Sequence, residues 1–283
     1  GYRSLKNAIK QSCDTYFYEA ARLLGVDRLN QTAKKFGLGD VVLGSYFNEK
    51  KGVVPSTKWK KEAIGQNWYL GETLINGIGQ GYIQTTPLQL CLMTAQLANG
   101  GHKIYPKIIV DSKQESVEII KEKIKLAEEN NKEDSKLFSA TERIFAPNEK
   151  NYRALYRNKE NVKFVLDAMF RSTNELYGTS FSSRIEDPKY QFAGKTGTAQ
   201  VKRITEEDRE LDLKTNQIPY KERDHAWFIA FGPYKNPRYA VSILVEHGGS
   251  GSSAAAPIAK KLFKSIIDRH DQREQIKTKH LTD

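Results

Sequence analysis

Cysteine and histidine are scarce in this sequence, which has 2 cysteines and 5 histidines among 283 residues. Neither residue type occurs at the spacing that is typical of a metal site, and the histidines are scattered. Cys13 and Cys91 each lie inside an apolar helical pattern, so we expect both to be buried free thiols. We also expect no metal ion and no other cofactor.

Long apolar runs and basic stripes are absent as well. The chain has no run of about 18 apolar residues and no signal peptide, so no membrane-spanning helix is predicted within it. The formal net charge is +11, but the basic residues occur in stretches of mixed sign, without a stripe interleaved with aromatic residues. This distribution argues against nucleic-acid binding. Hydrophobic residues make up 39% of the chain, which is enough for a sizeable core.

A glycine-dense stretch at residues 77–81 lacks the lysine and the serine or threonine that a phosphate-binding loop requires. We therefore predict a tight turn there and no nucleotide site. The turn leads to a helix that begins at Thr86, with Pro87 in its first turn. Residues 86–98 would place apolar side chains on almost every face of this helix. We therefore expect the helix to be buried at the centre of the fold.

Helical periodicity is clearest near the two ends of the chain. Residues 4–24 are predicted to form two helical pieces with a break near Ser12, and either Ser12 or Asp14 is well placed to cap the second piece. Residues 38–75 are interpreted as loop-rich, with two tryptophans pinning them to the core. Further helices are predicted at about 27–36, 158–172 and 255–269.

Three strands are predicted, at 192–201, 225–232 and 239–246. The last two are apolar on both faces and are joined by a short link, so we expect an antiparallel hairpin covered by helices on both sides. Together these elements predict an α/β fold of the α+β type. An antiparallel sheet is flanked by helices and accompanied by a mostly helical subdomain.

The pattern divides the chain into one domain, residues 1–268, and a polar tail, 269–283, that we expect to fray. The helical part covers about 4–175 and includes a highly charged stretch, 111–150, interpreted as an exposed insertion. The sheet part, with its C-terminal helix, covers about 190–268.

The strand at 192–201 also carries the residues best suited to chemistry. In a strand, Lys195 and Gly197 face one side of the sheet. Thr196 and Thr198 face the other side. Lys195 offers a cation for a substrate carboxylate, the threonines offer hydroxyls, and Gly197 leaves room for a peptide along the strand edge. The alternative is an ordinary turn with a solvated lysine, because a bare Lys-Thr-Gly arises by chance in about one chain in fifteen.

A second motif, Ser-Cys-Asp, occupies residues 12–14 far upstream. Taken alone, it is most simply a helix N-cap. A Ser-x-Asn-like triplet followed by a distant Lys-Thr-Gly, however, supplies two of the three motifs of penicillin-binding proteins and serine β-lactamases. The pair therefore favours an acyl-transfer site.

The chain as a whole resembles the transpeptidase domain of the penicillin-binding protein 2 group, the elongation-type class B penicillin-binding proteins. The stretches that carry the resemblance come in the family's order and cover about residues 4–265. They are residues 12–18, 77–81 followed by 86–89, 194–200, and the hairpin around 225–228.

This resemblance implies a five-stranded antiparallel sheet between helices, with a cleft beside a helical subdomain. It implies a reaction in which a serine is acylated by a peptidoglycan stem peptide that ends in D-Ala-D-Ala and loses its last D-Ala. β-Lactam antibiotics mimic that terminus and trap the acyl-enzyme. The implied partners are stem peptides, β-lactams and membrane-embedded cell-wall synthesis proteins. The implied location is the periplasmic face of the bacterial cytoplasmic membrane, with an anchor upstream of this chain.

The resemblance also implies roles for individual residues. Ser12 would relay a proton between the catalytic lysine and the leaving amine. Lys195, Thr196 and Thr198 would hold the substrate carboxylate, and the Thr198 N–H would be one oxyanion donor. Asp14 stands where most of the wider superfamily has asparagine. It can pair with the catalytic lysine, but an ionised aspartate accepts hydrogen bonds without donating any.

One motif of the family is missing from this chain. The nucleophile belongs to Ser-x-x-Lys, and no serine here is followed by a lysine three residues later. We therefore expect a C-terminal part of a transpeptidase domain that is inactive by itself, with the nucleophile and the first strands of the sheet upstream. The alternatives are a serine β-lactamase or D-Ala-D-Ala carboxypeptidase, and a non-catalytic β-lactam-sensing module. The upstream sequence would separate a sensor, with signalling helices, from a transpeptidase, with a pedestal.

Overall fold

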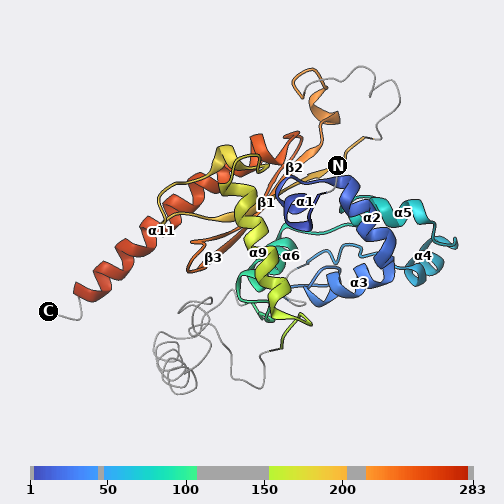
Figure 1. Ribbon diagram of the computed structural model, residues 1–283, viewed down its shortest axis with the longest axis horizontal. Coiled ribbons are helices and arrows are strands. Elements are labelled where there is room, and N and C mark those ends of the chain that lie inside the picture. Colours follow the sequence, from blue (N-terminus) through green and yellow to red (C-terminus); the bar gives the residue numbers. More distant parts are fainter. Residues whose placement is uncertain (1–2, 44–47, 107–152, 203–214, 280–283) are drawn as a thin grey trace.

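The computed structural model describes residues 3–43, 48–106, 153–202 and 215–279 (Figure 1). The predicted insertion, 111–150, lies outside these ranges. Among the described residues, helices accompany one antiparallel sheet, as the α+β pattern predicted. No helix in the described ranges is both long enough and apolar enough to span a membrane.

The sheet has the strand order β1-β2-β3, and both pairs are antiparallel. All three strands lie where the sequence predicted them: β1 (Ala193–Ala199), β2 (His225–Gly232) and β3 (Tyr239–Val245). Opposite Lys195 of β1 stands Ile229 of β2, so both side chains lie on the same face of the sheet. The described residues contribute three of the five strands that the resemblance implied.

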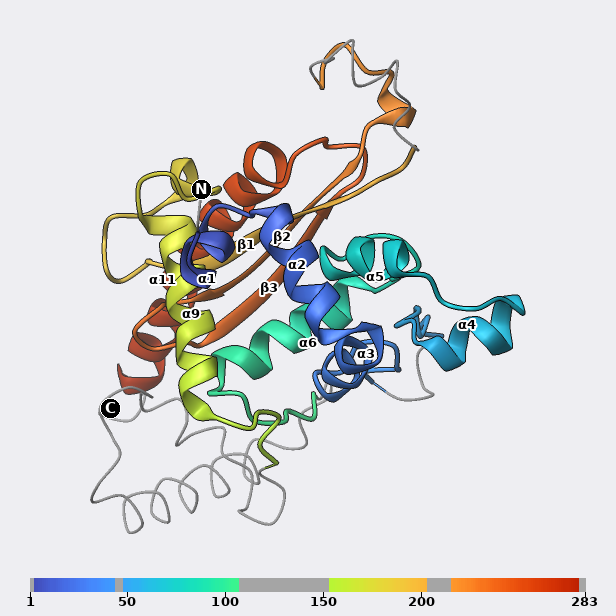
Figure 2. The ribbon, with the colours of Figure 1, turned by 45° about the vertical axis from the view of Figure 1, so that its right-hand side comes forward.

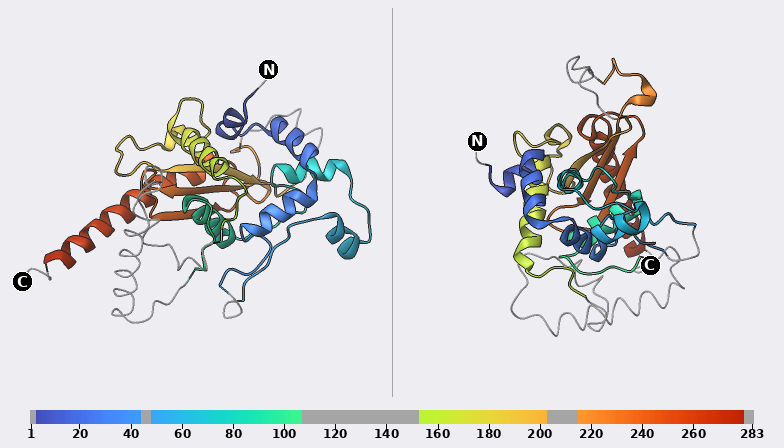
Figure 3. Two further views of the ribbon diagram at one scale, coloured as in Figure 1. Left: turned by 60° about the horizontal axis from the view of Figure 1, so that its bottom comes forward. Right: turned by 90° about the vertical axis from the view of Figure 1, so that its right-hand side faces the viewer.

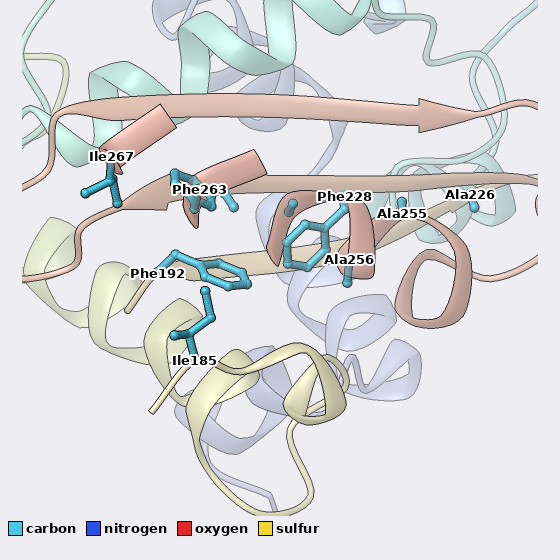
Figure 4. Close-up of a cluster of buried hydrophobic side chains, with 10 residues drawn as sticks. Ile185, Phe192, Ala226, Phe228, Ala255, Ala256, Phe263 and Ile267 are labelled. Carbon is cyan, nitrogen blue, oxygen red and sulfur yellow. The ribbon is translucent and has the colours of Figure 1, made fainter. Parts of the chain in front are cut away.

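One face of the sheet is covered by α11 (Ala256–Lys279), which carries Phe263 (Figure 4). The ring of Phe263 stacks on Phe192 with the ring centroids 5.0 Å apart. Phe228 of β2 meets the Phe192 ring edge-on at 6.2 Å. All three phenylalanines are fully buried, so this aromatic cluster fastens α11 to the sheet.

The opposite face is covered by α9 (Lys159–Asn174) and α6 (Pro87–Ala98) (Figure 2). The position of α6 beneath the sheet agrees with the prediction of a central helix, but its most buried side chains are polar. Gln96 donates to the carbonyl of Phe36, and Gln89 is equally buried and hydrogen-bonded. These glutamines stabilise the neighbouring loops because each buried side-chain amide donates to a backbone carbonyl of a loop.

The helical part lies beside one end of the sheet, and α11 extends past the other end (Figure 3). Two of its helices, at 57–64 and 70–77, begin inside residues 38–75, and the loop-rich interpretation of that stretch missed them. Each is only 8 residues long, too short for a clear apolar period, and each begins with a local cap. The helices are α1 (Leu5–Lys10), α2 (Asp14–Leu24), α3 (Val26–Lys35), α4 (Thr57–Ile64) and α5 (Leu70–Gly77).

A buried ion pair joins α4 to α5. The Lys60 side chain is 1% exposed, and its ammonium donates to the Glu72 carboxylate. Around it lie the rings of Trp68, Tyr69 and Tyr82, which are placed for cation–π contacts. The tryptophans Trp59 and Trp68 both pack against the Tyr82 ring, so an aromatic cluster encloses the ion pair.

The C-terminal helix is longer than predicted. We expected it to end near Arg269 and the tail to fray, but α11 continues to Lys279. Lys189 forms ion pairs with Asp268 and Asp271 at 3.2 and 2.9 Å. The polar residues at the start of the predicted tail are thus attached to the body of the domain.

Candidate active site

The site begins at a sharp turn between α1 and α2. Ser12 occupies it with φ at +51°, a backbone region that non-glycine residues rarely adopt. The turn is closed by hydrogen bonds from the Ser12 amide to the Ile9 carbonyl and from the Cys13 amide to the Ala8 carbonyl. Backbone strain of this kind is concentrated at functional sites.

The same turn corrects the capping interpretation. The N-cap of α2 is Cys13, which makes no side-chain capping hydrogen bond, and Asp14 is the first residue of the helix. Neither Ser12 nor Asp14 therefore caps α2. The positive φ at Ser12 instead turns its hydroxyl toward β1.

Lys195 meets Ser12 across the gap between β1 and the helical part. Its Nζ donates to the Ser12 Oγ at 2.5 Å and to the Thr196 carbonyl at 3.0 Å. Burial lowers the pKa of Lys195 from 10.5 to about 8, and the attraction of the Asp14 carboxylate opposes this effect. The result is a desolvated cation that releases a proton more readily than an ordinary lysine.

The remaining predicted residues lie along β1. In the described part of the sheet β1 is an edge strand, because only β2 pairs with it. Gly197 stands opposite Trp227, and a Cβ on Gly197 would lie 3.2 Å from the Trp227 Cβ. Thr198 follows and is exposed. An unpaired strand edge with small and hydroxyl side chains is suited to adding an extended peptide.

A cavity of about 460 Å³ opens beside Ser12. Cys13 lies in its wall with a part-exposed side chain, so the prediction that both cysteines are buried was wrong. Hydrogen bonds at the start of α2, first from Thr15 and then from the Tyr16 amide, lower the pKa of the Cys13 thiol.

The described residues contain no group of three or more histidine, cysteine, aspartate or glutamate side chains that could hold a metal ion.

The sequence analysis missed one residue that contacts this site, Thr179. The Thr196 hydroxyl donates to the Thr179 hydroxyl at 3.3 Å. The Thr179 amide donates to the Lys10 carbonyl, two residues before Ser12, at 3.2 Å. Thr179 lies far from both motifs in the chain and belongs to neither, so no spacing rule could have indicated it.

The geometry therefore brings Ser12, Lys195 and Thr196 into one hydrogen-bonded group, with Asp14 acting on Lys195 through space. The Ser12 and Thr196 hydroxyl oxygens are 3.5 Å apart. Such an arrangement can hold an anion with a cation and hydroxyls, and it can pass a proton between Lys195 and Ser12.

Comparison with known proteins gives matches that cover most of this chain. The family model described as the penicillin binding protein transpeptidase domain matches residues 1–264. The peptidoglycan D,D-transpeptidase MrdA of Salmonella typhimurium is 32% identical in an alignment 279 residues long, which covers 95% of this chain and 38% of that protein. The chain thus spans less than half the length of this relative.

Solved structures show the same likeness. PBP2 of Pseudomonas aeruginosa superimposes with a TM-score of 0.69 at 36% identity, over 94% of this chain and 49% of that chain. A complex of PBP2 with MreC from Helicobacter pylori gives a TM-score of 0.69 at 29% identity, over 95% and 41%.

Proposed function

Because this chain belongs to the family of penicillin binding protein transpeptidase domains, we propose that it forms part of a peptidoglycan D,D-transpeptidase of the PBP2 type. The observation that carries the proposal is the hydrogen bond from Lys195, on an edge strand, to Ser12, in a strained turn. It places a cation and a hydroxyl together where an extended peptide can lie.

In the proposed reaction, a serine of a Ser-x-x-Lys motif upstream of this chain attacks the D-Ala-D-Ala terminus of a stem peptide. The serine oxygen bonds to the peptide carbonyl carbon, and the C–N bond to the last D-Ala breaks. The lysine of that motif takes the proton of the attacking serine, Ser12 relays it to the leaving amine, and Lys195 keeps Ser12 polarised. The nitrogen of an acceptor amine from a second stem peptide then bonds to the acyl carbon, the ester C–O bond breaks, and a proton from the amine returns to the serine oxygen.

The substrate carboxylate is held by Lys195 with the hydroxyls of Thr196 and Thr198, and the Thr198 amide donates to the oxyanion. Gly197 allows the peptide to lie against the β1 edge. Asp14 stabilises the positive charge of Lys195 and pairs with the lysine of the nucleophile motif. The support for these roles is the clustering of Ser12, Lys195 and Thr196.

The partners proposed are peptidoglycan stem peptides, β-lactam antibiotics and membrane-embedded cell-wall synthesis proteins. A structure of PBP2 with MreC from Helicobacter pylori supports the last group. The proposed location is the periplasmic face of the cytoplasmic membrane, with the anchor in a segment upstream of this chain, because the substrate peptides are found there.

The test uses the protein extended upstream through Ser-x-x-Lys. It should cross-link a D-Ala-D-Ala donor peptide to an acceptor amine, and mass spectrometry should detect the joined product. Lys195→Ala should slow acylation by a penicillin at least about a hundredfold, because it removes a charge-assisted contact in a desolvated cleft. Lys235→Ala, in the exposed turn after β2, is the control. Hydrolysis without cross-linking would indicate a carboxypeptidase, and an acylation rate within about threefold of wild type would remove Lys195 from the site.

A further inference from the structure

Two parallel pairs of hydroxyls join the end of α9 to the segment that follows it. The Ser172 and Thr179 hydroxyl oxygens are 3.0 Å apart, and those of Thr173 and Ser180 are 3.2 Å apart. Ser172, Thr173 and Ser180 are fully buried. Only the first pair reaches the active site, through the hydrogen bond that the Thr196 hydroxyl donates to Thr179.

Glycine makes this close approach possible. A Cβ on Gly178 would lie 2.3 Å from the Ser172 carbonyl oxygen, so any other residue would push the segment away from α9. The preceding Tyr177 has φ at +64°, which turns the chain back toward the helix. Thr179 therefore contacts three elements that build the site: Ser172 on α9, Thr196 on β1 and the Lys10 carbonyl at the end of α1.

We propose that Thr179 is a positioning residue, whose hydroxyl sets the direction in which the Thr196 hydroxyl points. The inference rests on the proposed function, because it assumes that Thr196 binds the carboxylate of the substrate or of a penicillin. A hydroxyl both donates and accepts, so a chain of hydroxyls can reverse direction without moving a heavy atom.

The reversal couples Thr179 to substrate binding. In the free site the Thr196 hydroxyl donates to Thr179. When a carboxylate arrives, the Thr196 hydroxyl turns to donate to it, and the Thr179 hydroxyl turns to donate to the Thr196 oxygen. The donated bond polarises Thr196 and strengthens its contact with the anion. Valine at position 179 keeps the shape of threonine but cannot take part in this exchange.

The decisive experiment measures penicillin acylation in the protein extended upstream through Ser-x-x-Lys. Rates are measured over a range of penicillin concentrations. They give two constants: the dissociation constant of the non-covalent complex and the limiting rate of acylation. Thr179→Val should raise the dissociation constant about tenfold, the effect of one hydrogen bond to an anion-binding group, and leave the limiting rate within about threefold. Thr179→Ser keeps the hydroxyl and should stay within about twofold of wild type.

Thr173→Val is the matched control, because it removes a buried hydroxyl from the parallel pair that does not reach Thr196. It should lower the thermal midpoint but leave the dissociation constant unchanged. The proposal is overturned if Thr173→Val weakens penicillin binding as much as Thr179→Val, or if Thr179→Val does not weaken it. If Thr179→Val does not fold, Thr179→Ala replaces it, and an unchanged dissociation constant there likewise overturns the proposal.

A double-mutant cycle separates this inference from the proposed function. In the acylation assay, Thr179→Val should add no further loss to Thr196→Val, since both act through one contact. The same cycle in urea unfolding of the 283-residue chain needs no catalysis. If the extended wild-type protein is not acylated, the proposed function fails. Coupling between the two positions in the unfolding cycle would then support the contact, and its absence would overturn it.

Discussion

The Lys195 ammonium donates a hydrogen bond to the Ser12 hydroxyl at 2.5 Å, although 183 positions separate the two residues in the chain. Two local features produce the contact. The turn before α2 holds Ser12 at positive φ, and β1 presents Lys195 on the face nearest the helical part. The contact desolvates the lysine, so its charge state and the stability of the fold are linked.

The first prediction concerns pH. The pKa of Lys195 is about 8 in the folded chain and 10.5 in an ordinary environment. Between these values the unfolded chain holds a proton that the folded chain has released, so stability rises with pH across this window. Below pH 8 both states are protonated, and the destabilisation of about 3 kcal/mol is fully present.

Lys195→Met removes this titration. Urea unfolding gives the unfolding free energy of wild type and of the variant at each pH. The difference, wild type minus variant, should increase by about 3 kcal/mol between about pH 7 and about pH 10.5. Lys235→Met, at an exposed turn, should show no such change. A difference that stays flat across the window would mean that Lys195 is not desolvated.

The second prediction separates the two interpretations of Ser12. Asparagine tolerates positive φ better than serine, so Ser12→Asn should keep or slightly raise the thermal midpoint. Because an amide cannot pass a proton as a hydroxyl does, penicillin acylation of the upstream-extended protein should collapse. Ser4→Asn is the control, since Ser4 caps α1 through its side chain and asparagine caps equally well. Retained acylation in Ser12→Asn would remove Ser12 from the proton relay.

Local pattern was sufficient for much of the fold. The strands predicted at 192–201, 225–232 and 239–246 agree with β1, β2 and β3. The last two were recognisable because a continuous apolar run of seven or eight residues between turn residues indicates a buried strand. The motifs at Ser12 and Lys195 were also visible, since each is a short pattern of chemically suited residues.

Tertiary contacts were not visible in the same way. The turn at Ser12 was mistaken for a cap because serine and aspartate near a helix start usually do cap it. Thr179 was missed because its role depends on where α9 ends and on a close approach at Gly178. Lys60 was given no role because it belongs to the stretch interpreted as loop-rich, although a buried aromatic cluster encloses it.

The third prediction concerns that buried ion pair. Although burial raises the pKa of Glu72, hydrogen bonds from Lys60, the Tyr69 amide and Tyr82 hold it below its ordinary value. Glu72→Gln keeps the helix cap but leaves the Lys60 charge unpaired, so it should lower the unfolding free energy by about 3 kcal/mol. The double variant Lys60→Met with Glu72→Gln should recover most of this loss in urea unfolding. No recovery would show that the pair itself stabilises the fold.

The last prediction is that the 283-residue chain does not form an acyl-enzyme. Covalent catalysis requires a nucleophile with an adjacent base, and in this family that is a serine with a lysine one helical turn later. No serine in the chain has that partner, and the residue three positions after Ser12 is Thr15. Lys195, Thr196 and Thr198 have the proposed role of holding a carboxylate, and none of them is a serine with a lysine one helical turn later. Fluorescent penicillin should therefore leave no covalent label in a denaturing gel, whereas the protein extended upstream through Ser-x-x-Lys should be labelled at one serine. Stoichiometric label mapped to a serine of the chain would contradict both the missing motif and the role given to Ser12.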